Sequence, residues 1–106
     1  MADSLQRMQK LQEMLQRQPD DLFLLYALAM EHRKVGNLAE ALQYLTRVME
    51  KEPGYCAAYQ QAGQIHEQAG NVESARQAYV AGIAAADRAG DRHAKQEMEE
   101  ALHVIS

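Results

Sequence analysis

The sequence predicts an all-α fold made of repeated helix pairs, and three observations indicate this class. The 106 residues are rich in Ala, Gln, Glu and Leu, with two prolines and few β-branched residues, a composition that favours helix over strand. Apolar residues recur at helical spacing along the chain. Several residues also recur 34 positions later, as Pro19 does at Pro53. A single domain of about six helices is therefore expected.

The 34-residue period fixes where the helices begin and end. Each unit starts at a proline and carries Gly-Asn in its middle, and glycine readily adopts the left-handed backbone that ends a helix. Gly36 and Gly70 are thus predicted to separate two helices within each unit. The recurring pairs are Pro19 and Pro53, His32 and His66, Gly36-Asn37 and Gly70-Asn71, Ala41 and Ala75, and Gln43 and Gln77.

The elements follow in order from apolar periodicity and these stops. An N-terminal helix is expected over about Asp3 to Arg17, and the first unit then places one helix before Gly36 and one after it. The second unit repeats this pattern, but its second helix runs on through 84–88 to a stop at Gly90. A last helix is expected over roughly Arg92 to Ile105, with Ala94, Met98, Ala101, Leu102 and Ile105 along one side.

The two units resemble the tetratricopeptide repeat, a helix-turn-helix of 34 residues. The matching positions in repeat one are Leu25, Leu28, Ala29, Gly36, Leu38, Ala41, Leu45 and Pro53. Those in repeat two are Tyr59, Ala62, Gly63, Gly70, Val72, Ala75 and Tyr79. Small residues at these places allow neighbouring helices to approach closely. The sequence departs from the family pattern at His32 and His66, where tyrosine is usual, at Gly82, where alanine is usual, and in lacking a proline after repeat two.

The resemblance implies a helical-repeat α-solenoid covering the whole chain as one domain. Leu11, Met14 and Pro19 stand where the second helix of a preceding repeat would have its own residues, so the N-terminal segment is interpreted as a half-repeat. The expected layout is a half-repeat helix over 1–18, repeat one over 19–52, repeat two over 53–90, and a capping helix over 91–106 that covers the exposed end of the array.

The resemblance also implies a binding surface, because first helices of this family line a concave groove. The stretch LFLLYALAM, Leu22 to Met30, has nine residues without a charge. Its leucines and Ala29 are assigned to packing, and its three other large residues, Phe23, Tyr26 and Met30, are expected to face the groove. The implied peptide-binding groove consists of Phe23, Tyr26, Met30 and Arg33 in repeat one and Ala57, Gln60, Gln64 and Glu67 in repeat two. Apolar anchors and amides suit an extended or helical peptide.

The function expected from this surface is a non-catalytic adaptor or scaffold that binds a protein or peptide. The alternative is a self-associating structural module, a homodimer formed through the N-terminal helix or the capping helix. Its candidate contacts are Met1, Leu5, Met8 and Leu15, on a helix with an open flank. The carboxylate clamp of co-chaperone members is not expected, because Tyr26, Met30, Gln60 and Gln64 stand at the places of its lysine and asparagine residues.

Other classes of function are disfavoured by composition. A net charge of −4 with scattered basic residues argues against nucleic acid. No apolar run approaches the roughly 20 residues that span a membrane, so a cytoplasmic location is expected. Cys56 is the single cysteine and is interpreted as a packing residue. His32 and His66 are interpreted as core residues and His93 and His103 as surface residues, so neither a metal site nor a cofactor is expected. No catalytic grouping is recognised, and the chain is similar to compact bacterial members of the family.

Overall fold

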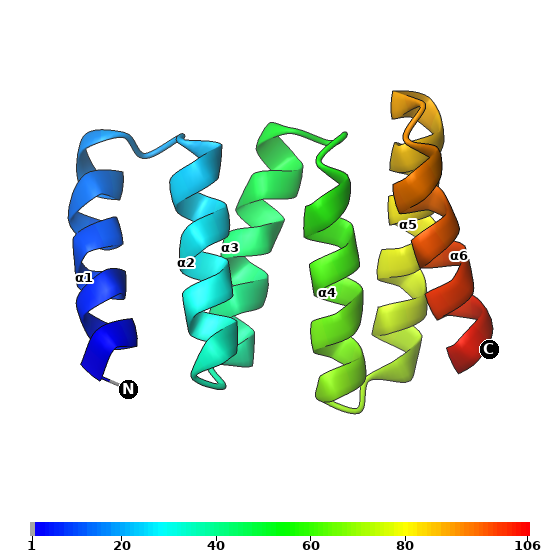
Figure 1. Cartoon of the computed structure of the whole chain (residues 1–106), viewed down its shortest axis with the longest axis horizontal. Helices are drawn as coiled ribbons and strands as arrows, with labels where there is room; N and C mark the ends of the chain where they lie inside the picture. The colour runs from blue at the N-terminus through cyan, green and yellow to red at the C-terminus, as the bar shows by residue number, and fades with distance from the viewer. Residues whose placement is uncertain (1) are drawn as a thin grey trace. The chain divides into compact units, whose positions relative to one another are not determined.

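A computed structural model describes residues 2–106, with Ala2 described by its backbone alone. Six α-helices account for nearly all of these residues (Figure 1). They are α1 (Ala2–Arg17), α2 (Leu22–Lys34), α3 (Leu38–Lys51), α4 (Cys56–Gln68), α5 (Val72–Ala89) and α6 (Arg92–Ile105). The all-α helical-repeat class is confirmed.

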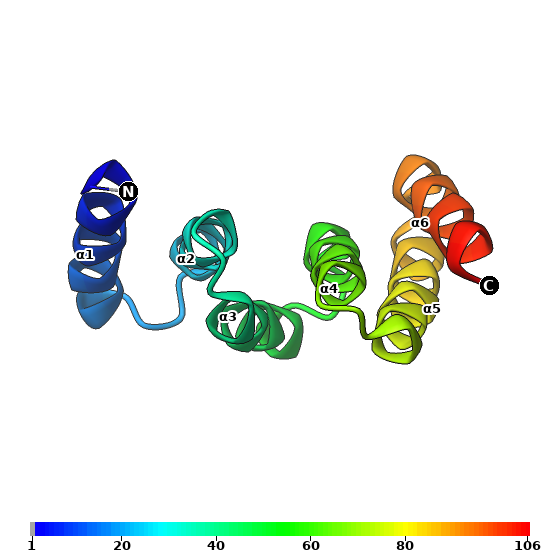
Figure 2. The same cartoon turned by 90° about the horizontal axis from the view of Figure 1, so that it is seen from below.

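The helices form two compact units, one reaching to Lys51 and the other spanning Glu52–Ser106. In unit 1, α2 packs extensively on α3 and also on α1, and neighbouring helices run in opposite directions (Figure 1). In unit 2, α5 packs on both α4 and α6, and α6 also touches α4 (Figure 2). Each unit therefore contains one helix hairpin, α2–α3 or α4–α5, and one additional helix.

The turn inside each hairpin has the same construction. Gly36 and Gly70 adopt left-handed backbone, with φ of 87° and 82°. The next amide, of Asn37 or Asn71, donates to a carbonyl in the last turn of the preceding helix, with an N–O distance of 2.8 Å in both cases. These bonds satisfy carbonyls that the helix end would leave unpaired. The expected stop at Gly90 is also confirmed, because its φ is 71° and it caps α5.

The core of unit 1 is aliphatic. The leucines of α2 other than Leu22 are buried, and they meet buried residues of α1 and α3. Asp21 fixes the start of α2, since its carboxylate accepts from the amide of Leu24 at 3.1 Å. The buried apolar residues of unit 1 are Met8, Leu15, Leu24, Leu25, Leu28, Ala29, Ala41, Leu45 and Val48.

Two of the residues on α1 that are predicted as self-association contacts are buried, which corrects that part of the alternative prediction. Met8 and Leu15 are buried and belong to the core of unit 1, because they lie on the same face of α1, seven residues apart. Leu5 is 57% exposed and remains available to a second copy. Met1, the fourth candidate contact, lies outside the described residues.

The core of unit 2 is built around one aromatic side chain. Tyr79 of α5 is fully buried, and a Cβ added at Gly63 of α4 would come within 2.7 Å of its ring. The absent Cβ therefore lets the two helices approach across the ring. The cluster that buries Tyr79 also contains Ala75, Ala86, Ala94 and Met98.

Gly82 provides a test of this close packing. A Cβ at this position would lie 2.7 Å from Tyr59 Cβ and 3.1 Å from Met98 Cε. Helix propensity alone favours Gly82→Ala by about 1 kcal/mol. We expect the opposite sign, a loss of about 1–3 kcal/mol in the free energy of unfolding, because the added methyl overpacks the core. Urea denaturation followed by circular dichroism measures the difference, and a stabilised variant would contradict this packing.

Candidate peptide-binding site

The groove residues predicted in repeat one lie along one side of α2. Phe23, Tyr26, Met30 and Arg33 follow each other at spacings of three and four, so they share a helix face. Phe23 is 74% exposed, and the other three are half-buried. We refer to these four residues as the α2 face. The buried residues of this helix, which belong to the core of unit 1, are Leu24, Leu25, Leu28 and Ala29.

The groove residues predicted in repeat two lie along α4. Ala57 and Glu67 are exposed, and Gln60 and Gln64 are half-buried. Glu67 also has a structural contact, since its carboxylate accepts a hydrogen bond from the hydroxyl of Tyr79. The hydroxyl of a buried tyrosine thus finds its acceptor at the edge of the core. These four residues are the α4 face.

A cleft between α1 and α2 was not predicted from the sequence. It has a volume of about 390 Å³ and lies within unit 1. Arg7 and Glu31 stand at one end, with Met14 and Phe23 at the other, since the two helices run antiparallel. It shares Phe23 and Met30 with the α2 face. The residues that line it are Arg7, Lys10, Leu11, Met14, Phe23, Ala27, Met30 and Glu31.

An ion pair joins the two helices beside this cleft. Arg7 Nε lies 3.0 Å from Glu31 Oε1, and Lys34 Nζ lies 3.7 Å from the other carboxylate oxygen. Burial alone would raise the pKa of the Glu31 carboxyl, but hydrogen bonds and positive charge from Arg7 and Lys34 outweigh it and hold this pKa below its ordinary value. Glu31 is therefore an anion at neutral pH, and it positions Arg7 at the rim of an apolar cleft.

Two of the histidines, His32 and His93, contact neighbouring side chains. The ring of His32 stacks on Tyr44, with centroids 5.5 Å apart, and its Nδ1 accepts from Asn37 Nδ2 at 3.2 Å. His66 is half-buried, and its Nδ1 has no hydrogen-bond partner among the described residues. His93 Nε2 lies 3.1 Å from Glu97 on the exposed side of α6. Within residues 2–106, no three His, Cys, Asp or Glu side chains are grouped to hold a metal ion.

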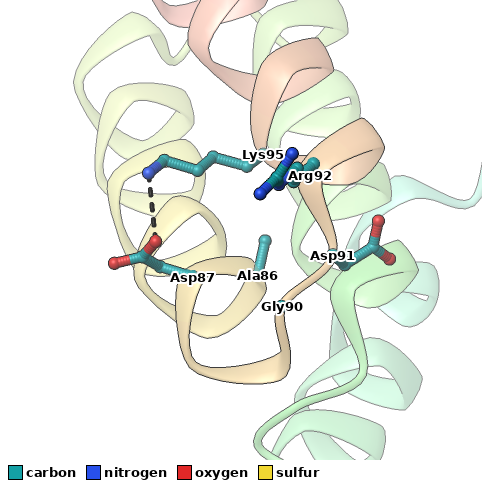
Figure 3. A pocket seen from close by; sticks show the side chains of 6 residues that line it. All are labelled: Ala86, Asp87, Gly90, Asp91, Arg92 and Lys95. Carbon is teal, nitrogen blue, oxygen red and sulfur yellow. Dashed lines mark hydrogen bonds and ion pairs between the residues drawn. The ribbon is translucent and has the colours of Figure 1, made fainter.

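A smaller hollow of about 180 Å³ lies at the turn between α5 and α6. Figure 3 shows Lys95 reaching across to Asp87, with Nζ 3.0 Å from Oδ1, while Asp91 points away from this pair. Asp91 caps α6 instead, accepting from the amide of Ala94 at 3.0 Å. The hydrogen bond and charge of Asp87 raise the pKa of Lys95. Asp87, Asp91 and Lys95 therefore stabilise the turn, and their side chains do not point together into the hollow to bind a ligand.

Cys56 is half-buried at the start of α4. Its Sγ lies 3.4 Å from the carbonyl oxygen of Gly54. Burial, together with the negative charge of Asp91, raises the pKa of the Cys56 thiol. The thiol is therefore protonated at neutral pH and is a weak nucleophile there.

No helix in the described part of the chain is both long and apolar enough to cross a membrane. The candidate surfaces described above are the α2 face, the α4 face and the cleft between α1 and α2, all on packed helix hairpins or beside them.

Comparison with known proteins identifies the helical repeats. A family model described as tetratricopeptide repeat matches residues 32–97. A TPR repeat-containing protein of Pseudomonas aeruginosa is 33% identical over 88 residues, which cover 83% of this chain and 84% of that protein. The solved tetratricopeptide repeat domain protein of Salinibacter ruber is 31% identical, with a TM-score of 0.78, over 83% of this chain and 89% of that one.

A further solved structure, PcrH in complex with the chaperone binding region of PopD, has a TM-score of 0.88. The match covers 98% of this chain and 79% of that one at 14% identity, so it shows similarity of fold alone. The family match spans more than half of the chain, and the Pseudomonas relative agrees with it. The chain belongs to the tetratricopeptide repeat family.

Proposed function

We propose that this protein is a non-catalytic adaptor or scaffold that binds a peptide or protein segment on the exposed faces of its first helices. The observation that carries the proposal is the exposure of Phe23, at 74%, on the same helix face as Tyr26 and Met30. Apolar groups gathered on a surface are a common feature of protein-binding sites. The fold is consistent with this use, because PcrH, of the same fold, was solved with a segment of PopD.

The α2 face and the α4 face supply different contacts. The α2 face offers an aromatic ring, a thioether and a cation, which suit apolar side chains and a nearby acidic residue. The α4 face offers Gln60 and Gln64, whose amides can both donate to and accept from a peptide backbone. A ligand of the α2 face therefore carries at least one bulky apolar anchor, and a ligand of the α4 face has an accessible backbone.

The proposal predicts that charge on the α2 face removes ligand binding while leaving the fold intact. Peptides selected from a displayed random library against the immobilised protein should bind the wild type in a fluorescence anisotropy titration. Their affinity should fall about tenfold or more in Phe23→Glu and in Tyr26→Glu, because a carboxylate replaces the apolar contact. Circular dichroism melting is the folding control.

Val80→Glu is the matched variant, since Val80 is exposed on α5 and belongs to neither face. It adds the same charge and should leave the affinity of the selected peptides unchanged. Peptides that bind Phe23→Glu and Tyr26→Glu as well as the wild type would overturn the assignment of the α2 face.

A further inference from the structure

The apolar residues of α1 that line the cleft stand at positions that are buried elsewhere in the repeat. Leu11 and Met14 correspond, 34 residues later, to Leu45 and Val48 of α3. Both of those residues are fully buried, and α2 packs over α3. In α1, by contrast, Leu11 is half-buried and Met14 is 47% exposed. The equivalent apolar side chains are therefore buried in α3 and partly exposed in α1.

In the second repeat, the corresponding face of α5 is covered in the same way. A further 34 residues along the chain, Leu45 corresponds to Tyr79 and Val48 to Gly82, both on α5. Tyr79 and Gly82 are also buried. Tyr79 lies against Gly63 of α4. Each complete hairpin thus places a first helix over this face of its second helix. Among the described helices that carry these equivalent residues, α1, α3 and α5, α1 alone lacks such a cover, since it packs chiefly on α2.

We infer that the cleft between α1 and α2 binds an amphipathic helix of a partner protein, which would cover α1 as α2 covers α3 and α4 covers α5. This inference rests on the proposed protein-binding function and adds a second surface to it. The covering helices of this chain show the side chains required. They are a bulky residue followed one turn later by small ones, as in Tyr59, Ala62 and Gly63 of α4. Such a helix would bury the apolar floor of the cleft.

Charge further defines the partner helix. In unit 2 the covering helix places the carboxylate of Glu67 at the hydroxyl of Tyr79. The corresponding residue of α1 is Leu11, and its neighbour Lys10 lines the cleft. Lys10 forms no ion pair with another described residue. A partner helix with an acidic residue at the place of Glu67 would supply one.

A second folded copy of this chain does not offer such a helix. The exposed large apolar residues of α1, Leu5 and Met14, are nine positions apart, and Val72 and Val80 of α5 are eight apart. Outside α2, whose Phe23 and Met30 line the cleft itself, no described helix exposes two large apolar residues within one turn, whereas the covering pattern needs spacings of three and four. The cleft therefore suits a helix from a different protein.

A peptide copied from α4 tests the inference. The probe is a fluorescein-labelled peptide with the sequence of residues 55–69, carrying Cys56→Ser, titrated with the full chain in an anisotropy assay. We expect saturable binding that Met14→Glu weakens about tenfold or more and Lys10→Glu weakens about threefold or more. Gln9→Glu is the matched control, because Gln9 is exposed on α1 and does not line the cleft. It should leave the affinity unchanged.

Further results distinguish binding in the cleft from binding on the α2 face and from association of two copies. A probe carrying Glu67→Lys should bind the wild type more weakly and regain affinity for the Lys10→Glu protein, as a charge swap requires. Absence of saturable binding, or equal binding by Met14→Glu, would overturn the inference. Loss of binding in Tyr26→Glu but not in Met14→Glu would also overturn it, while leaving the proposed α2 face intact. A dimer seen by light scattering that Met14→Glu dissociates would assign the cleft to a second copy instead.

Discussion

Replacing Tyr79 by alanine should lower the free energy of unfolding by about 3–5 kcal/mol. The side chain is fully buried at the centre of unit 2, and Gly63 leaves no side chain that could fill the space. The loss combines the removed apolar contacts with the cavity that remains. For a chain of this size such a loss is a large part of a total stability of about 5–15 kcal/mol. Urea denaturation followed by circular dichroism at 222 nm measures it.

Tyr79→Phe separates the ring from the hydroxyl. The ring keeps its packing in this variant, and the hydrogen bond from the hydroxyl to Glu67 is lost. The cost should be smaller, about 0.5–1.5 kcal/mol, since the acceptor is an exposed carboxylate that water can solvate. A Tyr79→Ala variant as stable as Tyr79→Phe would show that the ring does not support the core.

The second large effect is predicted in α2, where Leu28→Ala should cost about 2–5 kcal/mol. Leu28 is fully buried in the core of unit 1. Phe23→Ala, five residues earlier on the same helix, should change stability by less than about 0.5 kcal/mol because Phe23 is mostly exposed. The same denaturation experiment compares them.

This pair also separates folding from binding. Phe23→Ala should weaken the library-selected peptides although it leaves the fold unchanged, because the exposed ring is available to a ligand and not to the core. A strongly destabilised Phe23→Ala protein would mean that the ring packs within unit 1, and the α2 face would lose its principal anchor.

The fold could be predicted because the residues that end its helices act locally in the sequence. Gly36 and Gly70 end helices through their own backbone conformation, and the 34-residue period repeats that signal with the small residues that permit close helix contact. The start of the last helix follows in the same way from the stop at Gly90. These features need only neighbouring residues, so the sequence reveals them.

The orientation of α1 could not be predicted in this way. Its apolar residues spread over a wide arc of the helix, and spacing alone does not say which part faces a neighbour. Met8 and Leu15 are buried, whereas Leu5 and Met14, toward the two edges of that arc, are exposed. The cleft was missed for the same reason, since it depends on how α1 packs on α2.

The proposed binding residues could be predicted only in part. Phe23 could be singled out because its neighbours Leu24, Leu25 and Leu28 fill the packing positions of the repeat. The contact between Glu67 and Tyr79 could not, because it joins residues on two helices. A groove position identified from the family pattern can thus have a structural contact as well.

Photo-crosslinking in the organism that makes the protein tests the central claim most directly. A benzophenone amino acid replaces Phe23 in one variant and the exposed Val80 in a matched variant. The account predicts a discrete crosslinked protein from position 23 that is absent from position 80 and is lost when Tyr26→Glu is added. No crosslink at position 23, or the same products from both positions, would contradict the α2 face as the binding surface.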